Sequence, residues 1–211
     1  MMTFKTFLQQ DLQSLAETNN TIQVIKFDVM DYGSHEGFVE QVASATGPEG
    51  LNVLINNAGI YNKVSLTEGS SQSIMENVEV NAVAPFMLTR AFLPLLSMSA
   101  KSNGNPVVAN ITSKMGSMDD NTSGGHYAYR TSKAAMNMIT KSLSVDLAPE
   151  GIKAVAIHPG WVLTDMGGPQ APLSTETSVS NMVNTIQRVS QDEIGKDGNI
   201  FLNFDGDTIP W

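Results

Sequence analysis

The sequence contains no cysteine and only three histidines, His35, His126 and His158. Without cysteine, disulfide bonds, thiolate zinc sites and a cysteine nucleophile are all excluded. The histidines form no HxxxH pair, which argues against a histidine metal site. We therefore predict no bound metal.

Basic residues are also scarce, since 12 Lys and Arg stand against 21 Asp and Glu and the formal net charge is -9. No cluster of Lys and Arg is available to offset the repulsion between this charge and phosphate groups. Neither nucleic acid nor an anionic membrane is therefore expected as a partner.

Long uninterrupted apolar runs are missing as well. Residues 1–17 have neither a basic start nor an apolar core, so they do not form a signal peptide. The longest apolar stretch, residues 82–98, is interrupted by Pro85, Arg90 and Pro94. It predicts a buried core helix and not a membrane span. The cytoplasm is the expected location.

What the sequence does contain is an alternation of helical and strand patterns over 211 residues, with no repeat and no break in composition. We predict a single domain over residues 1–211. Strands that alternate with helices indicate βαβ units and a three-layer α/β fold with a Rossmann-like, doubly wound parallel sheet. The expected helices are residues 3–18, 34–45, 71–99, 127–147 and 176–189, and the expected strands are residues 22–28, 51–55, 106–111, 153–157 and 199–204.

Polar residues follow several of these strands directly. In open parallel sheets, ligands bind at the carboxyl ends of the strands, so these positions predict a ligand site. The residues concerned are Asp28, Asn56-Asn57-Ala58-Gly59, Ser113 and His158-Pro159-Gly160.

The segment Tyr129-Arg-Thr-Ser-Lys133 spaces a phenol and an ammonium four residues apart in an expected helix, which places them on one face. A neighbouring cation favours the phenolate, so the pKa of Tyr129 is expected to fall from about 10 toward the working pH. Such a tyrosine can donate a proton to a developing alkoxide. Tyr127 is the local competitor, but Thr131 lies four residues after it. An incidental Tyr–Lys pair is the alternative.

Ser113 follows the strand 106–111 and a loop then leads to Tyr129. A hydroxyl at this position can donate a hydrogen bond to the same carbonyl oxygen as the phenol. Thr112 and Ser117 are rivals for this role, and a plain turn serine is the alternative.

Two asparagine positions complete the pattern. The glycine of Asn56-Asn57-Ala58-Gly59 permits a tight turn whose amides can line an adenosine site, although a simple strand-end turn is the alternative. Asn81 lies inside an expected helix, where its amide competes with the backbone. A carbonyl freed by this disturbance could hold a water in a proton relay, although Asn81 taken alone fits an ordinary surface residue.

Taken together, Asp28, NNAG at 56–59, Asn81, Ser113, Tyr129-x-x-x-Lys133 and PGWVLTD at 159–165 occur in the order found in classical short-chain dehydrogenases/reductases. The sequence resembles this family from about residue 3 to the end. HPGWVLTDMGG and the closing DGDTIPW are especially similar to the small carbonyl reductases related to Drosophila sniffer and bacterial C-factor. The joint match is far more specific than any single motif.

The resemblance implies a role for each catalytic candidate. Tyr129 would be the acid/base, Lys133 would lower its pKa and hold the nicotinamide ribose, and Ser113 would steady the substrate. Asn81 would position a relay water. The resemblance thus implies that Tyr129 and Lys133 also contact the cofactor.

The resemblance also implies the cofactor contacts. Asp28 would meet the adenine, Asn57 with Ala58 and Gly59 the adenosine ribose region, and the segment 159–164 the nicotinamide side. In that segment the implied contacts are Pro159, Gly160, Val162 and Thr164. The cofactor would be NADP or NAD, and the family resemblance slightly favours NADP.

Family members begin with a strand, a TGxxxGxG loop and a helix, whose backbone amides cradle the pyrophosphate. No TGxxxGxG occurs in these 211 residues. We expect a Rossmann-like domain without its first β-α-β segment, roughly 30 to 40 residues. A truncated gene model or an alternative start is the expected explanation. The residues that choose between NAD and NADP would lie in that segment.

The function implied is an NAD(P)-dependent oxidoreductase that reduces a small-molecule aldehyde or ketone to an alcohol. The alternative, from another class, is a catalytically silent fragment of the family that acts as a signalling or binding protein. The helices at 71–99 and 127–147 resemble those that pair in family dimers, so a homodimer is possible.

Overall fold

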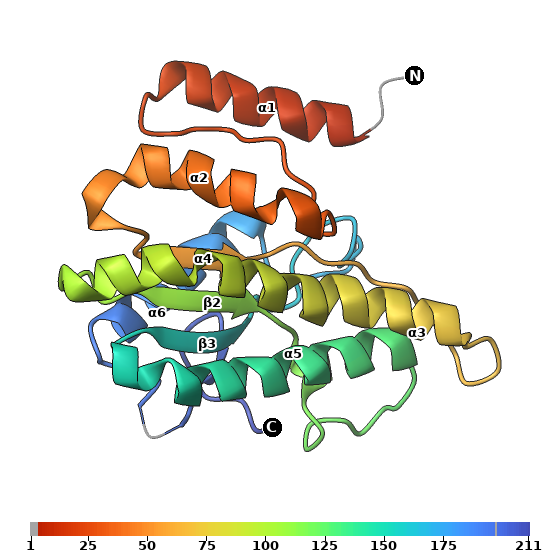
Figure 1. Cartoon of the computed structure of the whole chain (residues 1–211). Helices are drawn as coiled ribbons and strands as arrows, with labels where there is room; N and C mark the ends of the chain where they lie inside the picture. Colours follow the sequence, from red (N-terminus) through yellow and green to blue (C-terminus); the bar gives the residue numbers. More distant parts are fainter. Residues whose placement is uncertain (1–3, 197) are drawn as a thin grey trace.

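The computed structural model describes residues 4–196 and 198–211, and its secondary structure follows the predicted alternation except at residues 22–28 (Figure 1). The helices are α1 (Phe4–Thr18), α2 (His35–Thr46), α3 (Ser71–Val78), α4 (Ala84–Lys101), α5 (Tyr127–Asp146) and α6 (Thr175–Ser190). The strands are β1 (Val53–Asn56), β2 (Val107–Ile111), β3 (Lys153–His158) and β4 (Phe201–Asn203). Short 3-10 turns cover Tyr32–Ser34, Gly47–Glu49, Lys114–Gly116 and Ala148–Glu150.

The strands form one parallel sheet in the order β1-β2-β3-β4. All four follow the chain order, so the reversal of strand order that marks a doubly wound sheet does not fall within the part of the chain that the structure describes. The pairing sets Asn56 beside Asn110 and Ile111 beside Ile157. The residues that follow β1, β2 and β3 therefore lie along one edge of the sheet.

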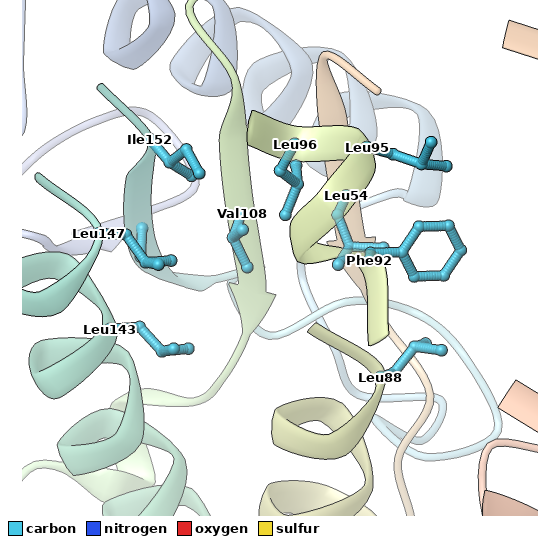
Figure 2. Packing of buried hydrophobic residues seen from close by; sticks show 10 residues of the cluster. Leu54, Leu88, Phe92, Leu95, Leu96, Val108, Leu143, Leu147 and Ile152 are labelled. Atoms are coloured by element: carbon cyan, nitrogen blue, oxygen red, sulfur yellow. The ribbon is translucent and has the colours of Figure 1, made fainter. Parts of the chain in front are cut away.

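Helices cover both faces of the sheet, which confirms the three-layer α/β prediction. On one face, Leu54 of β1 and Val108 of β2 pack against apolar side chains of α4 and α5, such as Phe92 and Leu143 (Figure 2). On the other face, Val107 and its neighbours in β2 and β3 pack against α6. Adjacent residues of a strand point to opposite faces, so a strand buried on both sides carries an unbroken apolar run.

A chain of buried polar side chains crosses the sheet. Asn56 of β1 donates to Asn110 of β2 at 2.7 Å, and Asn110 donates to the hydroxyl of Thr140 on α5 at 2.8 Å. Asn56 also donates to Thr89 on α4 at 3.0 Å. All four side chains are at most 5% exposed. These bonds tie the ends of β1 and β2 to the helices above them.

The expected helix over residues 71–99 is confirmed, but it contains a π-helical turn, Glu79–Val83, between α3 and α4. The whole stretch Ser71–Lys101 is long and apolar enough to cross a membrane, with a hydropathy of 1.3 in its most apolar window. Half of that window is buried within the fold, as occurs in core helices of soluble proteins. Its packing against the sheet matches the predicted core helix.

The expected strand Ile22–Asp28 is wrong, because these residues join no sheet in the described part of the chain. A strand needs a neighbouring strand to satisfy its backbone groups, and the sheet ends at β1. The segment instead runs between α1 and α2 (Figure 1). There the Phe27 ring stacks on the Phe38 ring of α2, with 4.0 Å between their centres. Its apolar pattern reflects this packing and not strand pairing.

We expect the isolated 211-residue chain to be of marginal stability. The edge of β1 is unpaired among the described residues, and Val53 and Ile55 are 37% and 48% exposed. Exposed apolar strand edges are templates for aggregation. Hydrophobic-dye binding and a thermal melt measure this directly. A monomeric chain with a cooperative melt above about 60 °C, the upper mesophile range, would contradict the prediction.

Candidate active site

A cavity of about 880 Å³ lies at the carboxyl ends of β1, β2 and β3. Nine of the candidate residues line it: Asn57, Gly59, Ser113, Tyr129, Lys133, Pro159, Gly160, Val162 and Thr164. The structure thus brings together groups from four separate parts of the sequence. Three other candidates, Asp28, Ala58 and Asn81, are not part of the cavity wall.

Tyr129 stands in the first turn of α5 with its side chain buried, and Ser113 faces it from the end of β2. Burial raises the pKa of the Tyr129 phenol, while a hydrogen bond from Ser113 lowers it and the nearby Tyr61 raises it. The net pKa is raised. The expected lowering is therefore wrong for this structure, because the loss of hydration outweighs the stabilisation of the phenolate.

Lys133 lies one turn after Tyr129 and is 5% exposed. Its ammonium donates a hydrogen bond to the carbonyl of Ile111 at 2.8 Å and lies 5.7 Å from the centre of the Tyr129 ring. Burial lowers the pKa of Lys133 to about 8. The spacing of four residues does place the two groups on one face, as predicted.

Asn81 lies in the π-helical turn and is fully buried. Its side chain accepts a hydrogen bond from the backbone of Ile60 at 2.8 Å and donates to the carbonyl of the same residue at 2.9 Å. It also donates to the hydroxyl of Ser132 at 2.9 Å. The amide thus connects the loop after Gly59 to the residue that precedes Lys133. Such π turns are frequent at functional sites.

The loop Asn56–Gly59 brings only part of its length to the cavity. Asn57 and Gly59 line it. A Cβ atom at Gly59 would lie 3.1 Å from the Asn81 side-chain oxygen and 3.8 Å from the Lys133 nitrogen, so this position holds the chain close to both. Asp28 instead accepts a hydrogen bond from the backbone of Met30 at 2.9 Å, as in a turn.

The segment after β3 forms the opposite wall. Gly160 has a φ of 83°, and a Cβ atom there would lie 2.7 Å from Leu173, so a glycine is required. The carbonyl of Pro159 accepts a hydrogen bond from Ser178 of α6 at 2.7 Å. These contacts hold the strand end, while Val162 and Thr164 continue along the cavity.

The rival hydroxyls are engaged elsewhere. Thr112 donates to Asn137 of α5 at 2.7 Å, and Ser117 accepts from the backbone of Asp120 at 3.0 Å. Tyr127 is 40% exposed and does not line the cavity. Ser113 is the one of the three candidate hydroxyls after β2 that faces Tyr129.

Sequence reasoning missed three residues at this site, Tyr61, His126 and Arg130, and it gave His158 no role beyond its place at the end of a strand. Tyr61 and His126 form a hydrogen-bonded pair beside Tyr129. Arg130 donates to the carbonyl of Met115 at 3.2 Å, which ties the loop after β2 to α5. His158 lines the cavity, and burial lowers its pKa to about 4. Arg130 and His158 stood within recognised motifs, but no spacing rule pointed to Tyr61 or His126.

Gly116 packs directly on α5, and we expect Gly116→Ala to destabilise the fold by about 1–3 kcal/mol. An added Cβ would lie 2.7 Å from the backbone of Lys133, which cannot move independently of the helix. Gly37→Ala is the matched control, because a Cβ there meets nothing within 4 Å. Urea unfolding gives the midpoint of each variant. Equal midpoints for Gly116→Ala and Gly37→Ala would contradict the prediction, because they would show that the loop at Gly116 moves to accommodate the added Cβ atom.

The buried ammonium of Lys133 predicts a specific dependence of stability on pH. The pKa is about 8 in the fold against 10.5 for a free lysine, so the unfolded chain binds more protons between these values. The free energy of unfolding therefore rises with pH through this window, by roughly 3 kcal/mol in total. We expect Lys133→Met to lack the rise. Urea unfolding between pH 8 and 10.5 measures the free energy of unfolding of wild type, Lys133→Met and the control Lys101→Met, which changes an exposed lysine on α4. If wild type and Lys133→Met showed the same dependence on pH, the buried ammonium of Lys133 would not be its cause.

The sheet, the cavity and the Ser–Tyr–Lys arrangement define the class of protein. Residues 5–173 match the family described as short chain dehydrogenase, and the chain belongs to this family of oxidoreductases.

Three individual proteins illustrate the similarity within this family. The chain is 42% identical over 167 residues to C-signal of Myxococcus xanthus, a match that covers 79% of this chain and 95% of that protein. The structure is similar to the carbonyl reductase Sniffer of D. melanogaster, with a TM-score of 0.90 and 41% identity over 96% of this chain and 83% of that one. It is also similar to an NADPH-bound carbonyl reductase from chicken fatty liver, with a TM-score of 0.87 and 34% identity over 96% and 82% of the two chains.

Proposed function

We propose that this protein reduces an aldehyde or ketone to an alcohol, with NADPH or NADH as the hydride donor. One observation carries the proposal: the hydroxyls of Ser113 and Tyr129 face each other in a cavity that the buried Lys133 also lines. Two neighbouring hydroxyls can each donate a hydrogen bond to a carbonyl oxygen on which negative charge develops.

The residues present fit the nicotinamide end of such a cofactor. The Lys133 ammonium and the Asn57 amide line the cavity with the apolar wall of Pro159 and Val162. An ammonium and an amide can bind ribose hydroxyls, and an apolar wall suits a flat ring. The glycine at position 59 leaves room beside Lys133. A bound nicotinamide dinucleotide supplies the hydride.

The raised pKa of Tyr129 has a direct chemical meaning. A phenol with a raised pKa stays protonated at neutral pH and is a weaker acid than a free tyrosine, so it transfers its proton as the carbonyl oxygen gains negative charge. Ser113 steadies the same oxygen with a second hydrogen bond. Burial of both groups excludes water, which strengthens these interactions.

Lys133 and Asn81 support this step. A pKa of about 8 lets Lys133 hold a positive charge at neutral pH and yet release a proton with little cost. Asn81 fixes the backbone of Ile60 and the helix at Ser132, so the two sides of the cavity keep a constant separation. Loss of Asn81 would loosen both walls together.

The direct test is an assay of NADPH and NADH oxidation with a panel of aldehydes and ketones. Two proteins are compared: the 211-residue chain and a fusion that supplies a family TGxxxGxG segment ahead of Met1. We expect the fusion to oxidise the cofactor with at least one carbonyl compound. A folded fusion that binds the dinucleotide but turns over none of the panel would refute the proposal.

That negative outcome would favour the second candidate, a catalytically silent signalling or binding protein. The observation behind this candidate is the relative named C-signal, because the match spans 95% of that protein. The protein named C-signal is thus matched over almost its whole length, and its name denotes a signal. In this case, Tyr129→Phe should leave the activity of the protein unchanged in whatever assay reports it.

A further inference from the structure

Two side chains that the proposed mechanism does not use, Tyr61 and His126, contact each other, and Tyr61 also packs against Tyr129. The Tyr61 ring meets the Tyr129 ring edge-on, with 4.9 Å between their centres. The Tyr61 hydroxyl forms a hydrogen bond of 2.6 Å with Nδ1 of His126, the residue that precedes α5. Tyr61 lines the cavity. The three rings thus form a continuous row from the start of α5 to the acid/base candidate.

We propose that Tyr61 and His126 are a positioning pair for Tyr129, in which Tyr61 lines the cavity beside Tyr129 and His126 holds Tyr61 in place from behind. This inference rests on the proposed function. His126 holds the Tyr61 phenol, and the Tyr61 ring limits how far the Tyr129 ring can turn. Edge-on aromatic pairs are favoured at this spacing, so the contact stabilises one orientation.

The backbone around both residues supports a positioning role. Ile60, directly before Tyr61, is fixed through its backbone N–H and carbonyl by Asn81. His126 has a φ of 52°, a left-handed conformation that few residues other than glycine adopt. The pair therefore joins a clamped loop to the start of α5. A strained conformation of this kind occurs where the surrounding contacts hold it in place.

The two phenols are coupled electrostatically. Burial raises the pKa of Tyr61, and the charge of Arg130, the smaller effect, lowers it. Tyr61 in turn raises the pKa of Tyr129. The two phenols therefore influence each other, and a change at Tyr61 can be detected in the titration of Tyr129. This coupling provides a readout that does not depend on catalysis.

Four single variants of the 211-residue chain test the pair. Tyr61→Phe keeps the ring and removes the hydroxyl, and His126→Gly removes the imidazole but keeps the left-handed backbone. His126→Asn is the conservative variant, because asparagine tolerates this conformation and its side-chain oxygen stands at the same branch position as Nδ1. Tyr127→Phe is the matched control, since Tyr127 is exposed beside His126 and outside the cavity.

The first readout is tyrosinate absorbance against pH, measured for each variant and for the same variant with Tyr129→Phe added. The difference isolates the titration of Tyr129. We expect it to move to lower pH in Tyr61→Phe, which removes the phenol that raises the pKa of Tyr129, and to stay in place in Tyr127→Phe. An unchanged Tyr129 titration in Tyr61→Phe would overturn the inference, and the role of His126 is decided by the second readout.

The second readout is turnover by the fusion that carries the glycine-rich segment. Tyr61→Phe and His126→Gly each remove the hydrogen bond between the two side chains. From the usual net contribution of one hydrogen bond, each should lower kcat/KM about threefold to tenfold. His126→Asn should recover most of the loss. Full activity of Tyr61→Phe and His126→Gly would also overturn the proposed positioning role of the pair, and the proposed function would still hold. A fusion without activity would refute the proposed function instead, and the absorbance titration would still decide whether Tyr61 acts on Tyr129.

Discussion

Replacing Tyr129 with phenylalanine is expected to lower turnover by about 10²–10⁴-fold, the usual contribution of general acid catalysis. Only the hydroxyl is lost, and it faces Ser113 in the cavity. The ring keeps its edge-on contact with Tyr61, so the fold should be unaffected. Steady-state rates of carbonyl reduction, measured with the fusion that supplies the glycine-rich segment, give the result.

Tyr127→Phe serves as the control. It also removes a tyrosine hydroxyl, two residues before Tyr129, and the Tyr127 side chain is 40% exposed. It should leave the rate within about twofold of wild type, as expected for a surface substitution. If Tyr129→Phe kept more than half of the wild-type rate on any accepted carbonyl compound, Tyr129 would not be the acid/base.

The 211-residue chain itself is expected to bind NADH and NADPH poorly. The pyrophosphate would have no TGxxxGxG loop to meet, and a net charge of -9 adds repulsion. Loss of two charge-assisted hydrogen bonds alone weakens binding about 100-fold or more. Titration calorimetry of the chain and of the fusion gives the comparison. Micromolar binding by the chain would contradict the prediction and would require a substitute phosphate site.

Much of the fold followed from local patterns in the sequence. The run Leu51–Ile55 and the alternating helices give a parallel sheet, since apolar strands need cover on both faces. The spacing of Tyr129 and Lys133 set their shared face, and the strand ends gathered Ser113 with them. Strand pairing is not local, which is why Ile22–Asp28, with its good strand composition, was wrong.

The electrostatics and the finer contacts were beyond such patterns. The direction of the Tyr129 pKa depends on how deeply its phenol is buried, and a spacing of four residues does not show this. Asn81 binds Ile60 and Ser132, contacts that only the folded chain creates. The same holds for Tyr61 and His126. The location in the cytoplasm and the homodimer stay predictions.

The buried amides that cross the sheet also decide which register the strands adopt. A slip of two residues between β1 and β2 would keep every side chain on its own face, because the period of a strand is two. It would, however, set Leu54 beside Asn110 in place of Val108, the present neighbour of Leu54. Each amide left without a partner would then cost about 1–3 kcal/mol. Apolar packing alone would accept the slipped pairing, whereas the hydrogen bonds of Asn56 and Asn110 favour the native register, which also fixes the level of Ser113 in the cavity.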